Sequence, residues 1–329
     1  MKALIYLGPE KLVYIPVTLP TAAKGEVIVK VDSAGICGSD MHAYLGHDDR
    51  RPAPLILGHE VSGVIIEGPQ EGRRVTINPL VTCGACNACV AGRDNLCSTR
   101  QIISMPPREG GFAHFLSIPE SNTVTVPAGF SLEKASLTEP IACGWHAVRI
   151  ANETLGNDLT NAQTLVIGGG AIGVGAALSL KCFNAASITV LEPNKLRRDY
   201  LNMKTDLTVI DPEQLDENAQ YDLVIDGVGL AQTREAASKA ARPGGIIMHI
   251  GLGSSEGGLD IRRLTLQEIR FVGTYTYTAE DFHATAQAMF DGKLGLLDWY
   301  ECRPLSQGAN AFADIRKGDV QSPKILLKP

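Results

Sequence analysis

The chain has 329 residues, of which 44% are hydrophobic and 20% charged, and it carries a net charge of −6. This length favours two domains and a sizeable core, and the mild acidic balance argues against a nucleic-acid or anionic-membrane partner. No stretch approaches the ~20 apolar residues of a membrane span, and the apolar run near residue 1 is too short for a signal peptide.

Residues 1–145 are predicted to form short strands and turns. Val27, Val29 and Val31 alternate with Ile28, Lys30 and Asp32, a pattern typical of a half-buried strand. Further strands are predicted at 55–57 and 61–66, and glycine and proline residues break the segments between them.

The sequence pattern changes at about residue 146, where strand-like apolar runs begin to alternate with alanine-rich helical stretches. Strands are predicted at 164–167, 187–191, 207–210, 223–225, 246–250 and 271–272, and helices at 171–184, 196–202 and 233–241. This βαβα alternation predicts an α/β domain with a parallel, doubly wound sheet. A helix at 281–291 then leads into a short tail, in which residues 324–327 form a strand.

Four cysteines lie close together in the sequence with the spacing C-x2-C-x2-C-x7-C. They are Cys83, Cys86, Cys89 and Cys97, and we call this group the knot. Four thiolates this close can close a tetrahedral zinc shell with Zn–S distances of about 2.3 Å. Because such a shell leaves no position for water or substrate, we predict a structural zinc site. Eight cysteines in all, half of them in one loop, indicate metal binding in a reducing compartment, so we expect a cytoplasmic protein.

A glycine-rich turn joins the strand predicted at 164–167 to the helix that follows it. Gly168, Gly170 and Gly173 fit the fingerprint G-x-G-x-x-G. In this fingerprint the glycines permit a tight turn, close approach of a pyrophosphate, and close packing of helix on strand. We therefore predict that the turn, with Ala171 and Ile172, binds a dinucleotide.

An acidic residue, Glu192, follows Gly173 by nineteen positions, at the end of the next predicted strand. A carboxylate there can accept hydrogen bonds from the adenosine ribose and would repel a 2′-phosphate, which favours NAD over NADP. Lys195, Arg197 and Arg198 lie just beyond, so NADP remains the alternative.

A second metal site is predicted from three separate segments: 35–42 with Cys37, 58–60 with His59 and Glu60, and 138–140 with Glu139. A catalytic zinc takes about three protein ligands and keeps one position open. Cys37, His59 and a glutamate would meet that need. Each signal alone is weak, since a lone cysteine is more often a small core residue. Their occurrence beside the four-cysteine knot and the fingerprint favours the metal interpretation.

Taken together, these segments resemble the zinc-containing medium-chain alcohol/polyol dehydrogenases, most closely the sorbitol and threonine dehydrogenase branch. The resemblance covers nearly the whole chain. The segments that carry it are GICGSDMH (35–42), GHEVSGVI (58–65), the knot (83–97), GGFAHF (110–115), LTEPIACGWHA (137–147) and VIGGGAIG (166–173). It implies a GroES-like, zinc-binding β domain at 1–146, a Rossmann domain at 147–277 and a segment at 278–329 that returns to the first domain.

The resemblance also implies roles around the second metal. Cys37 and His59 would be ligands of the catalytic zinc, and either Glu60 or Glu139 would complete the set, directly or through water. Asp40 would orient the histidine ligand.

Three kinds of contact to the reacting molecules follow from the same resemblance. Ser39 would hydrogen-bond the substrate alcohol, and His42 would be the outer member of a proton relay. Gly227 would line the cofactor ribose and Gly251 the nicotinamide.

The implied activity is hydride transfer between NAD and a small-molecule secondary alcohol, a polyol or sugar alcohol, or its ketone. The resemblance further implies a homodimer or homotetramer that pairs through residues 268–275. One alternative is a threonine-type amino-alcohol dehydrogenase, which would need an acidic residue in its pocket. Another is a non-catalytic NADH- and zinc-binding protein, which would be expected to lack Cys37, His59 or Ser39.

Overall fold

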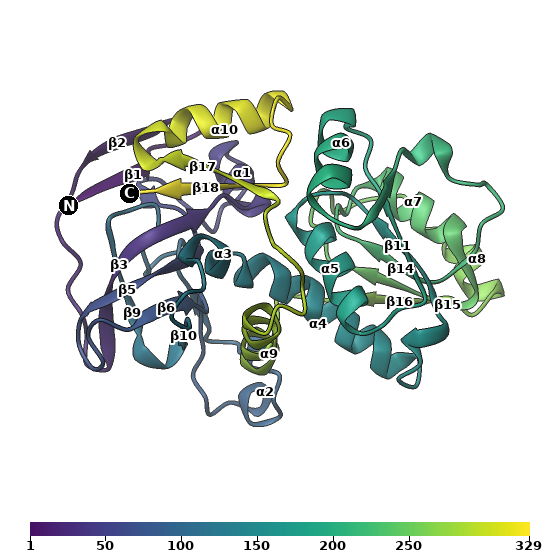
Figure 1. Ribbon diagram of the computed structural model, residues 1–329, viewed down its shortest axis with the longest axis horizontal. Coiled ribbons are helices and arrows are strands. Elements are labelled where there is room, and N and C mark those ends of the chain that lie inside the picture. The colour runs from purple at the N-terminus through teal and green to yellow at the C-terminus, as the bar shows by residue number, and fades with distance from the viewer.

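Two large sheets of different kind organise the molecule. The computed structural model describes residues 1–329, which form two lobes side by side, one around each sheet (Figure 1). The first lobe contains a seven-stranded sheet of order β10-β6-β5-β3-β18-β17, with β9 also paired to β3. Its strands are β3 (Glu26–Gly35), β5 (Glu60–Glu67), β6 (Arg74–Ile77), β9 (Phe115–Pro119), β10 (Thr123–Thr125), β17 (Tyr300–Pro304) and β18 (Lys324–Lys328).

The strand predicted around Val27–Val31 is part of β3 and is more deeply buried than expected. Val27, Val29 and Val31 are buried, and Lys30 is exposed as its alternation predicts, but Ile28 is buried as well. β3 is an interior strand, since it pairs with β5 on one edge and with β9 and β18 along its length.

A smaller three-stranded sheet of order β2-β1-β4 packs beside the first. Its strands are β1 (Lys2–Tyr6), β2 (Leu12–Pro16) and β4 (Leu55–Ile56), and β7 (Leu80–Val81) and β8 (Gln101–Ile102) form a separate pair. Tyr44, Phe112 and Phe312 contact one another in the core of this lobe, with Phe312 centred 5.2 Å from Tyr44 and 6.0 Å from Phe112. The rest of this core is mainly aliphatic.

The C-terminal segment contains more structure than the sequence predicted. The predicted strand is present as β18, but β17 and the helix α10 (Gly308–Lys317) precede it. β18 runs parallel to β17 and antiparallel to β3, with Leu326 opposite Gly35. The end of the chain is therefore built into the sheet that contains residues 26–35.

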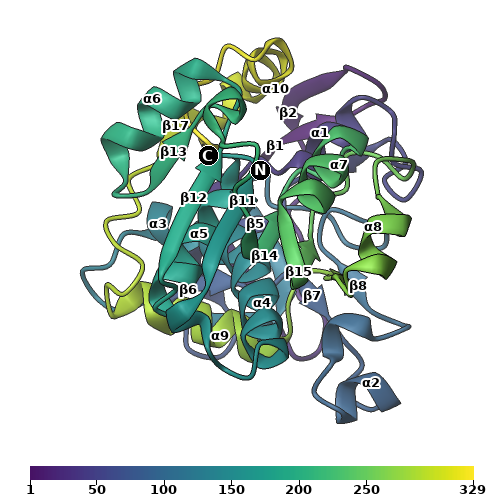
Figure 2. The ribbon, with the colours of Figure 1, turned by 90° about the vertical axis from the view of Figure 1, so that its right-hand side faces the viewer.

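The second lobe contains a six-stranded parallel sheet of order β13-β12-β11-β14-β15-β16, which confirms the predicted doubly wound fold. Figure 2 faces this lobe, with its parallel strands side by side. The strands are β11 (Gln163–Ile167), β12 (Ser187–Leu191), β13 (Thr208–Ile210), β14 (Tyr221–Asp226), β15 (Ala241–His249) and β16 (Arg270–Gly273). The helices are α5 (Ala171–Cys182), α6 (Lys195–Lys204), α7 (Ala231–Ala240) and α8 (Ile261–Leu266).

Two helices predicted in this lobe end earlier than expected. Ala241 was predicted to be helical, but it begins β15. The helix that starts at Ala171 ends at Cys182, before Asn184, which takes a left-handed conformation with φ 59°. Asparagine tolerates the left-handed conformation well, and a residue in that conformation cannot continue a right-handed helix.

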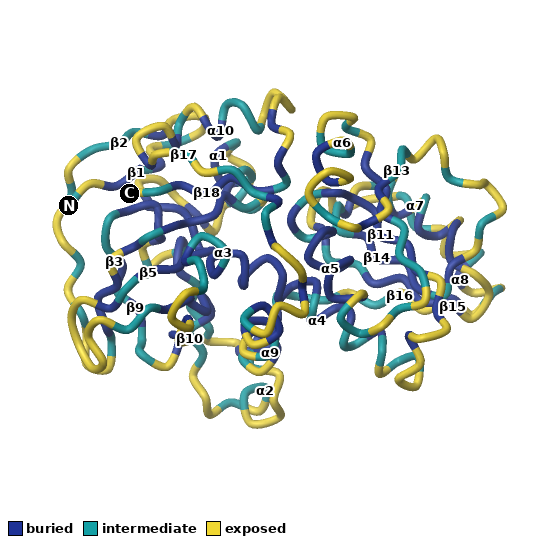
Figure 3. Tube along the Cα trace, viewed as in Figure 1, coloured by how far each residue is buried: buried dark blue, intermediate teal, exposed yellow.

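Helix α4 (Thr138–Thr154) runs from the first lobe into the second, and it contradicts the prediction of only short strands and turns before residue 146. Helices α1 (Gly38–Tyr44), α2 (Asn87–Val90) and α3 (Leu132–Ser136) also lie in that region. α4 and α5 approach closely through glycines: a Cβ on Gly144 would lie 2.4 Å from the backbone of Ala176. Most of α4 is buried between the two sheets (Figure 3).

Helix α9 (Ala279–Phe290) packs along α4 and begins the return to the first lobe. Asp281 ties the two helices, because its carboxylate accepts hydrogen bonds from Arg149 Nε at 2.6 Å and pairs with His146 Nδ1 at 2.6 Å. Short 3-10 turns lie at Asp94–Leu96, Glu120–Asn122, Leu159–Asn161, Pro212–Gln214 and Leu305–Gln307. None of the helices has both the length and the apolar character needed to cross a membrane.

Candidate active site and metal centres

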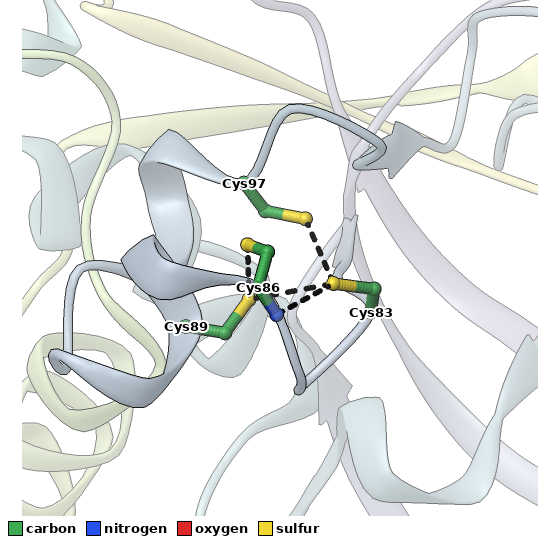
Figure 4. A group of neighbouring side chains, drawn as sticks. All are labelled: Cys83, Cys86, Cys89 and Cys97. Atoms are coloured by element: carbon green, nitrogen blue, oxygen red, sulfur yellow. Dashed lines mark hydrogen bonds between the residues drawn. The ribbon is translucent and has the colours of Figure 1, made fainter.

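The four cysteines of the knot point toward one another around α2 (Figure 4). The Sγ atom of Cys83 lies 3.6 Å from that of Cys97 and 3.9 Å from that of Cys89, and Cys86 Sγ lies 3.5 Å from Cys89 Sγ. Four sulfurs placed tetrahedrally at about 2.3 Å from a zinc ion would be about 3.8 Å apart. The spacing of the thiols therefore fits a closed zinc shell.

A second cluster forms where β3 ends and β5 begins. These strands are antiparallel, with Gly35 opposite Glu60, so the segment after one strand meets the segment before the other. As a result the ligand atoms of Cys37, His59 and Glu60 all lie within 4.8 Å of one another. His59 is 6% exposed, Glu60 is completely buried and Cys37 is half-buried. This thiol, imidazole and carboxylate set suits zinc.

Asp40 holds the two halves of the cluster together. Its Oδ2 accepts a hydrogen bond from the Cys37 amide at 3.0 Å, and its Oδ1 accepts one from the Gly58 amide at 3.2 Å. Oδ1 also lies 3.5 Å from His59 Nδ1. Burial alone would raise the pKa of Asp40, but His59 and Arg51 outweigh burial and lower it. The carboxylate is thus ionised and can fix the orientation of the imidazole.

Glu60 is paired on one side only. Its Oε1 accepts a hydrogen bond from Lys324 Nζ at 2.5 Å, whereas its Oε2 is buried and has no partner. There is space for this carboxylate because residue 35 is glycine: a Cβ there would lie 1.9 Å from Oε2. A buried carboxylate oxygen without a donor, next to a thiol and an imidazole, is the environment that a bound cation would satisfy.

Lys324 was not predicted as part of the site. Only 3% of this residue is exposed, and its ammonium also donates to the Ile36 carbonyl at 2.7 Å. Burial opposes its charge, but the Glu60 carboxylate outweighs burial and raises the pKa of Lys324. The only sequence signal is a lysine directly before the three apolar residues of a short strand.

Glu139 lies at the start of α4 and is outside the cluster of ligand atoms within 4.8 Å. Its Oε1 accepts a hydrogen bond from the hydroxyl of Tyr277, a fully buried residue that the sequence analysis missed. Burial, with the charge of Glu60, raises the pKa of Glu139. One turn further along α4, Cys143 is buried with Tyr277 and Phe282.

Ser39 and His42 both lie on α1, three residues apart, and both are half-buried. This spacing puts their side chains on one side of the helix. Ser39 Oγ lies 3.5 Å from Nη2 of Arg51, a buried arginine that the sequence analysis did not single out.

The glycine-rich turn between β11 and α5 could not be built from other residues. Gly168 has φ +103°, and a Cβ on Gly173 would lie 1.8 Å from the carbonyl oxygen of Gly168. Gly170 precedes the first residue of α5, and a Cβ there would meet no protein atom within 4 Å. Ala171 and Ile172 form the first turn of the helix. The turn therefore leaves room at a helix N-terminus for a phosphate group.

Gly227 and Gly251 lie at the same edge of the sheet. A Cβ on Gly227 would lie 3.3 Å from the Gly173 amide nitrogen. The amide of Gly251 donates to the Asp226 carbonyl at 3.1 Å, at the end of β14. Strand ends that meet in this way form the crevice where dinucleotides bind in open α/β sheets.

Glu192 is 4% exposed and lies directly beside the turn. Its carboxylate accepts hydrogen bonds from the Gly169 amide at 2.9 Å and the Asn194 amide at 2.8 Å. Of the nearby cations, Arg198 is paired with Asp211 at 2.7 Å, and Arg197 lies 3.6 Å from Glu192 itself. Both guanidinium groups are therefore close to carboxylates.

Comparison with known families agrees with this arrangement. The pattern of the alcohol dehydrogenase GroES-like domain matches residues 23–128, and that of the zinc-binding dehydrogenases matches residues 171–291. The chain is 32% identical to the L-galactonate-5-dehydrogenase of Escherichia coli K12 over 309 residues, which cover 89% of this chain and 88% of the relative. It is 30% identical to a probable D-xylulose reductase A of Neosartorya fischeri, with coverage of 83% and 81%.

A similar solved structure is that of an alcohol dehydrogenase from Escherichia coli CFT073 complexed with NADH. It superimposes with a TM-score of 0.89 over 100% of this chain and 99% of the other, at 26% identity.

Proposed function

Because the chain belongs to the family of zinc-containing medium-chain alcohol and polyol dehydrogenases, we propose that the cluster at Cys37, His59 and Glu60 is its active site. The protein is an oxidoreductase that transfers a hydride between an alcohol or polyol and a nicotinamide cofactor. The observation that carries the site assignment is the convergence of three zinc-type ligands, one of which, Glu60, has a buried carboxylate oxygen without a partner.

Cys37 and His59 hold the catalytic zinc in this proposal, with Glu60 as the third ligand. Glu139 stands close by as the alternative carboxylate, held by Tyr277. Zinc, when bound there, supplies a Lewis acid that makes the hydroxyl proton of the substrate easier to remove at neutral pH. Cys83, Cys86, Cys89 and Cys97 hold a second, structural zinc.

The proton of the substrate hydroxyl is then passed along side chains of α1. Ser39 accepts the proton of the substrate hydroxyl and passes on its own, and His42, on the same side of the helix, carries the charge to solvent. NAD⁺, when bound, accepts the hydride from the carbon that carries the hydroxyl. Asp40 keeps Cys37 and His59 in place throughout, through its bonds to both segments.

The cofactor is proposed to be NAD rather than NADP. Glu192 is fixed by two amides beside the turn at Gly168–Gly173, where its charge would repel a 2′-phosphate. Of the two arginines nearby, Arg198 is paired with Asp211 and Arg197 lies against Glu192 itself. Gly227 and Gly251 would border the ribose and the nicotinamide.

The substrate is proposed to be a secondary alcohol of a polyol, a sugar alcohol or a sugar acid. By their names, the relatives act on L-galactonate and D-xylulose, which both carry several hydroxyl groups. The test is a screen of NAD⁺ reduction over polyols, sugar acids, amino alcohols and simple secondary alcohols, with zinc quantified. We expect turnover of a polyhydroxylated compound and about two zinc ions per chain.

A matched pair of variants tests the site itself. Cys37→Ser should lose nearly all turnover and one zinc ion while it still binds NADH, because the cofactor residues are untouched. Cys302→Ser changes an exposed cysteine in β17 that belongs to neither metal group, and should behave as wild type. Wild-type turnover by Cys37→Ser would refute the assignment.

We further propose that the protein is a cytoplasmic homodimer or homotetramer. β16 forms an edge of the parallel sheet, and Phe271 on this strand is 37% exposed. Ile261 and Leu266 on the neighbouring α8 are 62% and 71% exposed, so pairing of two β16 strands would cover apolar surface. Sedimentation of wild type against Phe271→Asp would test this pairing. The unpaired state of all eight cysteines supports the compartment.

A further inference from the structure

Arg51 is a buried cation that joins three separate segments around Ser39. Its side chain is 2% exposed. Nε donates to the Ser104 carbonyl at 3.1 Å and Nη1 donates to the Asp48 carboxylate at 2.5 Å. Nη2 points at Ser39 Oγ across a distance of 3.5 Å, which is near the upper limit for a hydrogen bond. Burial of a guanidinium is costly, so a residue kept here must be compensated by its partners.

The neighbour on the chain, Arg50, contrasts with Arg51. It binds the same carboxylate, with Nε 2.8 Å from Asp48 Oδ1, but its side chain is 59% exposed. The exposed arginine could neutralise Asp48 without burial of a guanidinium group. The burial of Arg51 therefore indicates a requirement other than pairing with Asp48.

The direction of the Ser39 hydrogen bonds supplies such a requirement. A guanidinium has donors only, so Arg51 can meet the serine oxygen only as an acceptor. A hydroxyl has two lone pairs and one proton. With one lone pair turned to Arg51, the serine proton must point away from the guanidinium, and the other lone pair is left for the incoming substrate hydroxyl. A serine without this neighbour would rotate more freely, and its lone pair would face the substrate proton for less of the time.

We propose that Arg51 is a positioning residue that sets the direction of proton transfer through Ser39. The inference rests on the proposed function, since it assumes that Ser39 receives the substrate proton. The fixed positive charge also favours the electron density that gathers on the serine oxygen while the proton is in transit. No bond to Arg51 is made or broken during the reaction.

The test compares Arg51→Met and Arg51→Lys with Arg50→Met as the matched control. For alcohol oxidation, Arg51→Met should lower kcat about 10- to 100-fold, part of the contribution typical of general acid–base catalysis. KM, zinc content and the Kd for NADH should change little. Arg51→Lys should restore part of kcat, because it keeps one charged donor, and Arg50→Met should stay within about twofold of wild type. The solvent isotope effect in D2O should grow in Arg51→Met as proton transfer becomes slower.

A double-mutant cycle separates this role from a merely structural one. If Arg51 acts through Ser39, Arg51→Met should cost little further activity in a Ser39→Ala background. The inference is overturned if the losses multiply independently, or if Arg51→Met is as active as Arg50→Met. If Arg51→Met does not fold, Arg51→Lys and its cycle decide the question in the same way. Absence of turnover by wild type with any alcohol would instead refute the proposed function.

Discussion

Replacement of Lys324 by methionine should destabilise the first lobe far more than the same change at Lys328, four residues along the same strand. Lys324 Nζ is the only donor to the Glu60 carboxylate, and both groups are almost fully buried, with side-chain exposures of 3% and 0%. Removing one partner of a buried ion pair costs about 3–5 kcal/mol, since the other charge is left uncompensated. The hydrophobic stem that methionine retains offsets only part of that cost.

Lys328 is the matched control for the loss of stability expected at Lys324. It pairs with Asp32 and Glu133, but its side chain is 31% exposed, and a pair of that kind contributes about 0–1 kcal/mol. The assay is thermal melting at equal protein and zinc concentrations, because bound metal shifts the midpoint. Lys324→Met should melt on the order of 10 °C below wild type, and Lys328→Met within about 2 °C.

A cycle with Glu60→Gln then assigns the effect to the pair. Coupling between the two substitutions should exceed about 1 kcal/mol if the ammonium and the carboxylate interact directly. Equal melting of the two lysine variants, or additive losses in the cycle, would refute the reasoning.

Three further outcomes are expected. Gly170→Ala should keep wild-type stability, because its Cβ meets no protein atom, but it should weaken NADH binding. Gly173→Ala should also lower stability, because its Cβ would lie 1.8 Å from a carbonyl oxygen. Fluorescence titration and melting distinguish the two variants, and equal stability of the two would contradict this account. Cys89→Ser should reduce bound zinc from about two ions per chain to about one, measured by metal analysis. Asp281→Asn should melt below wild type at pH 7, and the gap should begin to narrow below about pH 4 and keep narrowing as the pH falls toward the lowered pKa of Asp281; a gap that widens below about pH 4 would be evidence against it.

The sign of that pH dependence follows from the position of Asp281. Burial would raise its pKa, but hydrogen bonds from His146, Arg149 and Thr278 outweigh burial and hold the pKa well below its ordinary value. A carboxyl group with a lowered pKa in the folded state stabilises the fold above its unfolded pKa, and that stability is lost as the pH falls through the lower value.

Sequence patterns were sufficient to predict the features that depend on residues close together in the chain. The parallel sheet, the glycine turn and the cysteine knot each depend on a short run of residues whose spacing has one ready explanation. Secondary structure near Glu139 was missed, since Pro140 and Gly144, residue types that usually mark turns and loops, lie in the first turns of α4.

The residues that the sequence did not reveal around the second cluster share one property. Tyr277 and Lys324 reach it from segments far away in the chain, and Arg51 reaches it from a loop twelve residues beyond Ser39. Each is of a type normally found exposed or in a core, and its contact to Glu139, Glu60 or Ser39 forms only in the folded chain. No spacing within the sequence encodes such a contact.

The pairing of β18 with β3 has a consequence for how the protein is made. Leu326 and Gly35 are partners across about 290 positions, and a ribosome that adds 5–20 residues per second needs roughly 15–60 s to synthesise the stretch between them. During that time the second lobe, whose sheet is contiguous in the chain from Gln163 to Gly273, has all of its own strands available. The first lobe must wait with an open edge at β3 and an uncompensated Glu60. We therefore expect the nascent chain to acquire its nucleotide-binding lobe before its metal-binding lobe is complete.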